Sequence, residues 1–126
     1  MHDISQADWK VFKGLRQLAL ERFCAQVLDD VARISSDHAK SKHDRYVEIY
    51  RLMQECDRKI NPIFDFLRRS SAVRQLYAFR SHDLLTAEEL KPLSPELRQR
   101  VEDFVQTFNQ PFEVIDEDDE VNPRAG

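Results

Sequence analysis

Residues 5–34, SQADWKVFKGLRQLALERFCAQVLDDVARI, decide the fold of this chain. Apolar side chains recur along this stretch at three- and four-residue steps, which is the period of an amphipathic α-helix. Ser5 precedes the pattern and Asp8 stands three residues after it, a spacing typical of a helix N-terminus. The sequence therefore predicts one long helix from about residue 5 to about residue 34.

The apolar face of this helix turns along its length. An early set comprises Val11, Phe12, Leu15 and Leu18, and a late set comprises Leu20, Phe23, Cys24, Val27 and Val31. On a helical wheel the centres of the two sets lie roughly 110° apart. A single neighbouring helix would select one continuous stripe, so we expect different neighbours at the two ends of this helix.

A second helix is predicted after the polar connection 35–41, SSDHAKS, where Ser41 and Asp44 repeat the capping spacing. So short a connection favours an antiparallel helix hairpin. Pro62 interrupts the second helix, because proline lacks the N–H donor and clashes with the preceding turn. The result is either a kink or a break, with Asn61 as the cap of a new segment. The apolar stripe of this helix is Tyr46, Tyr50, Met53, Ile60, Phe64 and Leu67.

Shorter helices follow. A third helix opens at Ser70, His82 and Asp83 form a turn, Thr86 to Glu89 form a capping box, and Ser94 caps a last helix that reaches residue 108. Residues 75–90, QLYAFRSHDLLTAEEL, resemble the short helix–turn–helix oligomerisation motif found at the ends of many bacterial proteins. The resemblance implies a helix hairpin here, and we carry over no function from it.

The predicted fold class is all-α: a bundle of four or five helices built on a long antiparallel helix hairpin. We expect one helical domain over residues 5–110 and an acidic flexible tail over residues 111–126. Residues 113–126 hold six acids and one arginine, a net charge of −5, so the other 112 residues (17 acids, 18 bases) sum to +1 within the total of −4. Such a tail buries too little apolar surface to offset the entropy of ordering it.

No catalytic, cofactor or metal site is predicted, and we expect a protein that is not an enzyme. The chain has only two glycines, Gly14 and Gly126, whereas phosphate-binding loops depend on glycine. No histidine follows an acid at the three-residue spacing of helical metal sites. Cys24 and Cys56 occupy apolar positions, which favours reduced, core-facing and unreactive thiols.

The basic stretch 66–82 is the candidate interaction surface, with Arg68, Arg69, Arg74, Tyr77 and Arg80 as its residues. Arginines beside aromatic rings suit phosphate contact and base stacking, and they equally suit an anionic protein or the acidic tail. A solvated face or intramolecular pairing is the favoured interpretation. Glu88 and Glu89 argue against a DNA-reading helix–turn–helix, because they would face phosphates or base edges.

Asp57 is the candidate buried polar residue, since it interrupts the apolar stripe of the second helix. Wheel geometry favours an edge position that reaches water. The alternative is a buried carboxylate that pairs with an arginine across the bundle.

The function these features favour is that of a non-catalytic cytoplasmic helical protein that acts through protein–protein contact as a homodimer. Two long helices carry more apolar surface than the short helices can cover. The partner is therefore a second copy or another protein, and no membrane, because no apolar run approaches the ~20 residues of a membrane span. The alternative is a nucleic-acid-associated regulator that uses the basic stretch, with the acidic tail competing for it.

Overall fold

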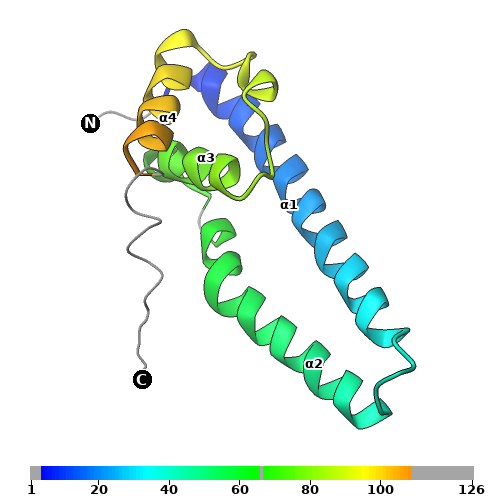
Figure 1. Ribbon diagram of the computed structural model, residues 1–126. Coiled ribbons are helices and arrows are strands. Elements are labelled where there is room, and N and C mark those ends of the chain that lie inside the picture. The colour runs from blue at the N-terminus through cyan, green and yellow to red at the C-terminus, as the bar shows by residue number, and fades with distance from the viewer. Residues whose placement is uncertain (1–3, 66, 109–126) are drawn as a thin grey trace.

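The computed structural model describes residues 4–65 and 67–108, and all its regular elements there are helical. The α-helices are α1 (Gln6–Ser35), α2 (Lys42–Glu55), α3 (Ala72–Ser81) and α4 (Pro95–Phe108). Between them lie one π-helical turn, η1 (Cys56–Ile60), and three 3-10 turns, η2 (Asn61–Phe64), η3 (Arg69–Ser71) and η4 (Glu88–Leu90). The all-α class and the antiparallel hairpin of α1 and α2 are confirmed (Figure 1). The predicted tail, residues 111–126, lies outside the described residues.

The long hairpin begins and turns where the capping residues predict. Ser5 Oγ accepts a hydrogen bond from the Asp8 amide (3.1 Å), and Ser41 Oγ accepts one from the Asp44 amide (3.0 Å). Across the connection, Arg45 Nη1 donates to the carbonyl of Ser35 (2.6 Å). Each cap satisfies a backbone donor that the first turn of a helix leaves unpaired.

The predicted capping box at Thr86 forms, but the helix behind it is a single turn. The Thr86 amide donates to Glu89 Oε1 (2.9 Å), and the Glu89 amide donates to Thr86 Oγ1 (3.2 Å). Pro92 follows almost at once, and proline has no N–H donor with which to extend the helix. Of the predicted four or five helices, the described residues therefore form four α-helices.

The second helix ends earlier than its apolar pattern predicts. α2 gives way at Cys56 to the π turn, in which the Asn61 amide bonds to the Cys56 carbonyl, and Pro62 then opens η2. The break at Pro62 is confirmed, but the capping role for Asn61 is wrong. Asn61 has helical φ and ψ, and its side chain donates to Asp57 Oδ1 (2.6 Å). The wider π turn changes the direction in which later side chains point.

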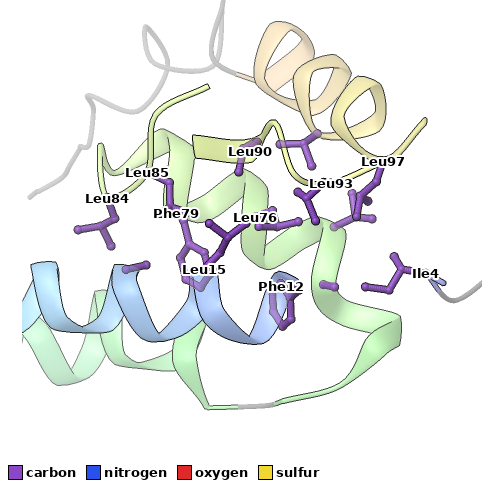
Figure 2. Packing of buried hydrophobic residues seen from close by; sticks show 14 of the residues in the cluster. Ile4, Phe12, Leu15, Leu76, Phe79, Leu84, Leu85, Leu90, Leu93 and Leu97 are labelled. Carbon is purple, nitrogen blue, oxygen red and sulfur yellow. The ribbon is translucent and has the colours of Figure 1, made fainter. Parts of the chain in front are cut away.

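The core lies at one end of the molecule, between the N-terminal half of α1, α3, α4 and the leucines of residues 84–93 (Figure 2). Phe12, Leu76, Phe79 and Val101 are fully buried there. Phe64 connects the hairpin to this core, because its ring stacks on Phe79 (5.1 Å between centroids) and on Phe23 (5.9 Å). The expectation that α1 meets different neighbours at its two ends is therefore confirmed.

The first half of the predicted stripe on α2 is not core. Tyr46, Tyr50 and Met53 are exposed by 67%, 55% and 39%, and α2 contributes no buried residue. Leu67 is exposed as well (48%). The physical reason is length: α3 packs against one end of α1 and α4 packs on α3, so neither short helix covers α2 (Figure 1).

A buried carboxylate joins the start of α1 to the start of α4. Asp8 is 6% exposed, and it accepts hydrogen bonds from the amide (2.8 Å) and the hydroxyl (2.6 Å) of Ser94. Ser94 Oγ in turn accepts from the Leu97 amide (3.3 Å), as an N-cap does. The sequence marks Asp8 only as a first-turn acid, because Ser94 is 86 residues away.

We expect Asp8→Ala to destabilise the protein more than Asp44→Ala by about 1–3 kcal/mol, because only the first change leaves a buried donor unpaired. The two acids occupy the same position after their capping serines, and Asp44 is exposed, so Asp44→Ala is the matched control. Urea unfolding followed by circular dichroism measures the difference. Equal losses would show that the contact with Ser94 adds nothing.

Candidate interaction surface

The C-terminal half of α1 (residues 20–35), the connection and α2 form an arm that extends away from the core (Figure 1). Its two helices meet along a half-buried seam that repeats at three- and four-residue steps. The seam consists of Leu20, Phe23, Val27, Val31 and the buried Ile34 on α1, with Arg45, Ile49, Leu52 and Cys56 from α2 onward. Among the described residues, the arm is thus only two helices thick.

Exposed apolar side chains gather on one side of this arm. On α1, Leu28 (66% exposed) lies about 100° beyond the seam, counted in the direction in which the chain turns. On α2, Tyr46, Tyr50 and Met53 lie beyond the seam in the same sense. Because α1 and α2 are antiparallel, a turn from the seam in the chain direction ends on the same side of the helix pair for both helices. We call these four residues the apolar side of the arm.

The opposite side of the arm carries charges. Asp30 pairs with Arg33 (3.0 Å), and Glu48 pairs with Lys40 (2.8 Å). The hydrogen bond that Lys40 donates to the Glu48 carboxylate raises the pKa of Lys40 above its usual value. Exposed pairs of this kind add little stability. They do keep that side of the arm solvated.

Two charged residues mark the ends of the stripe on α2. Lys42 stands four residues before Tyr46, and Asp57 stands four residues after Met53, and both are exposed. Asp57 therefore has the edge position, and the alternative of a buried pair with an arginine is wrong. Its carboxylate finds its partner locally, in Asn61.

The basic stretch does not form one face. Arg69 donates to Gln6 Oε1, and its guanidinium lies 5.8 Å from the centre of the Trp9 ring. Arg80 forms an ion pair with Glu102 of α4 (2.8 Å) and is largely covered. Both arginines thus have intramolecular partners on other helices.

The other three residues of the predicted surface, Tyr77, Arg68 and Arg74, differ in their surroundings. The Tyr77 ring packs on the Phe104 ring (5.7 Å between centroids), while Arg68 and Arg74 are exposed. Phe66, at the start of the stretch, lies outside the described residues. Tyr77 and Arg80 thus contact α4, Arg69 contacts α1, and the five predicted residues do not share one exposed basic face.

The prediction that both thiols face the core is wrong, because neither Cys24 nor Cys56 belongs to the buried core. Cys24 is exposed, because it lies between the seam and the apolar side, and Cys56 is half-buried. Burial raises the pKa of the Cys56 thiol, with nearby carboxylates adding to the effect. Within residues 4–65 and 67–108, no group of three or more His, Cys, Asp or Glu side chains could hold a metal ion. In the same part of the chain, no helix has the length and apolar character to cross a membrane.

Arg22 of α1 binds the leucine-containing segment 84–93 between α3 and α4. Its Nη1 donates to the Leu84 carbonyl (2.9 Å) and to Glu89 Oε1 (2.7 Å), and its Nη2 donates to Glu89 Oε2 (2.5 Å). The hydrogen bonds that the Glu89 carboxylate accepts from Arg22 have the largest effect on its pKa, and the one from the Thr86 amide comes next. Together they lower the pKa of Glu89 to about 2. Glu89 thus completes its capping box and holds α1 at the same time.

Because the pKa of Glu89 is lowered in the folded protein, its contribution is complete above the ordinary value of 4.5 and disappears as pH falls toward about 2. We therefore expect Glu89→Gln to lower the free energy of unfolding at neutral pH and to have progressively less effect below pH 4.5. Urea unfolding of the natural protein and the variant between neutral pH and about pH 2 measures this difference in the free energy of unfolding. A difference that does not vary with pH would contradict the assignment.

Comparison with known proteins places the fold. No family model matches the sequence, and no curated protein matches it. The structure is similar to the Fluorescence Recovery Protein from Synechocystis sp PCC 6803, with a TM-score of 0.71 and 20% identity over 81% of this chain and 97% of that chain. It is also similar to the Fluorescence Recovery Protein of Fremyella diplosiphon, with a TM-score of 0.71 and 17% identity over 82% of this chain and 98% of that chain. At these identities the likeness shows a shared fold.

Proposed function

We propose that this protein is a non-catalytic helical protein of the cytoplasm that acts through protein–protein contact, as a homodimer paired through its arm. The apolar side of the arm carries this proposal. Four large apolar side chains, each at least 39% exposed, lie there with no third helix of the described chain over them. An apolar patch on an otherwise charged element is characteristic of a protein contact.

The order of residues on α2 supports a second copy of the chain as the partner. Lys42, Tyr46, Met53 and Asp57 are arranged symmetrically about a point between residues 49 and 50. Two α2 helices related by a two-fold axis that is perpendicular to them run antiparallel. Lys42 of each copy then meets Asp57 of the other, and Tyr46 meets Met53, with the Tyr50 residues near the axis.

Pairing through the arms leaves the two cores free at the ends of the dimer. Each core presents its own surface to further protein partners. The two solved structures compared above carry the name Fluorescence Recovery Protein. From them we take the fold, and the chemistry of the arm supplies the argument for pairing.

Nucleic-acid binding is the weaker alternative, because Arg69 and Arg80 already have intramolecular partners. Phosphate contacts would make such binding strongly salt-dependent. Capture of partners from native lysate with and without nuclease separates the two functions. Partners that survive nuclease treatment support the protein-binding function, and partners that disappear support the alternative.

We expect Tyr50→Arg to convert a dimer into a monomer, because it places a charge at the centre of the paired apolar sides and on the two-fold axis. Arg51→Glu is the control, since Arg51 is exposed about 100° further around α2. Light scattering at tens of micromolar should give twice the 14.9 kDa chain mass for the natural protein and the control. A monomeric mass for the natural protein would refute the homodimer.

The pairing register has a separate test. Lys42→Glu and Asp57→Lys should each weaken the dimer by up to about thirtyfold, equivalent to about 2 kcal/mol, because the two-fold axis places this exposed ion pair twice in the dimer. The double variant should recover the loss, because it restores opposite charges across the axis. Sedimentation equilibrium gives the dissociation constants. Additive losses in the double variant would exclude this register while leaving the dimer itself intact.

A further inference from the structure

A groove lies on the surface where the end of the hairpin meets α3. Its volume is about 300 Å³, and its apolar lining comes from Pro62, Ile63, Tyr77 and Ala78. The buried side chain of Gln75 donates to the Ile63 carbonyl (2.7 Å) and so fixes the two walls relative to each other. This groove belongs to the core end of the molecule and is separate from the arm.

A single positive charge stands at the rim of the groove. Arg74 lines it and is exposed. Unlike Arg80, Arg74 forms no ion pair with any residue of 4–65 or 67–108. The groove therefore combines an apolar interior with a guanidinium at its edge. That combination fits a short apolar segment that continues into acids.

α4 ends close to this groove. Arg80 pairs with Glu102 and Tyr77 packs on Phe104, so α4 runs antiparallel to α3. Continuing this pairing by one turn brings residues 107–108 to Arg74. Figure 1 shows the last turn of α4 beside the start of α3. The 18 residues that follow, 109–126, thus leave the described part of the chain at the groove.

Those residues have the pattern that the groove fits. Residues 112–115, FEVI, contain three apolar side chains, and five acids follow directly at positions 116–120. Three residues separate Phe108 from Phe112. Even a fully extended link of this length spans about 14 Å, since each residue adds at most ~3.6 Å. The segment therefore reaches the groove without crossing the core.

We infer that residues 112–115 of this chain dock in the groove formed by Pro62, Ile63, Tyr77 and Ala78, with the following acids beside Arg74. The intramolecular tether raises the effective concentration of the segment at the groove, so weak contacts suffice. The docked segment covers the groove. Any other apolar and acidic peptide must displace it to bind there. This site is independent of the dimer contact on the arm.

A spin label on the full chain tests the docking. In a Cys24→Ser, Cys56→Ser background, a nitroxide is attached at Asp119→Cys, and amide signals are recorded by NMR. We expect the signals of Ser71, Arg74 and Ala78 to lose most of their intensity, and the signal of Val47 on the arm to keep it. Uniform intensities over all four amides would overturn the proposal.

Variants separate docking from mere proximity of a tethered chain. Phe112→Ser with Ile115→Ser should restore the signals of Ser71 and Ala78, whereas Val121→Ser, outside the segment, should not. Arg74→Glu should restore the Ser71 and Ala78 signals in part. Raising the salt from about 0.05 to about 0.5 M should do the same, because it shortens the screening length. Loss of signal that persists in the double-serine variant would overturn the proposal.

A mixture identifies whose segment occupies the groove. Isotope-labelled chains without nitroxide are combined with unlabelled chains that carry it. Docking within one chain predicts unchanged intensities in the mixture. Loss of the Ser71 and Ala78 signals in the mixture would assign the segment to a second copy and overturn docking in the same chain.

Discussion

The mismatch in length between α1 and the helices that cover it governs this structure. α1 has 30 residues and is about 45 Å long, whereas α3 and α4, with 10 and 14 residues, span about 15 and 21 Å. The short helices can bury only one end of α1. Beyond Phe23, α1 packs against α2 and the turn that follows α2, so the two helices share one half-buried seam and leave one apolar side of the pair exposed.

The π turn and Pro62 at the base of the arm determine which apolar side chains after α2 reach the core. The π turn widens the backbone just before Pro62, which cannot continue an α-helix. As a result Phe64 faces the core and stacks between Phe23 and Phe79, while Tyr46 and Tyr50 face outward. The apolar stripe predicted for the second helix therefore has one end in the core, at Phe64, and the other end exposed, at Tyr46 and Tyr50.

Polar contacts between distant segments hold the core end together. Asp8 reaches Ser94 at the start of α4, and Arg22 reaches Glu89 in the segment between α3 and α4. A carboxylate that accepts both a backbone amide and a hydroxyl leaves neither donor unsatisfied in the interior. These contacts fix how the C-terminal helices sit on α1, which in turn places the groove of α3 beside the end of α4.

Local signals in the sequence were enough for the all-α class, the long hairpin and the caps at Ser5, Ser41 and Thr86, because neighbouring residues produce them. The surface was harder to predict. Periodicity places Tyr50 on a stripe, but whether a stripe is buried depends on which helix covers it. Likewise Arg80 is a basic residue in the sequence and half of an ion pair in the structure. Burial and pairing arise between segments far apart in the chain, so only the tertiary structure decides them.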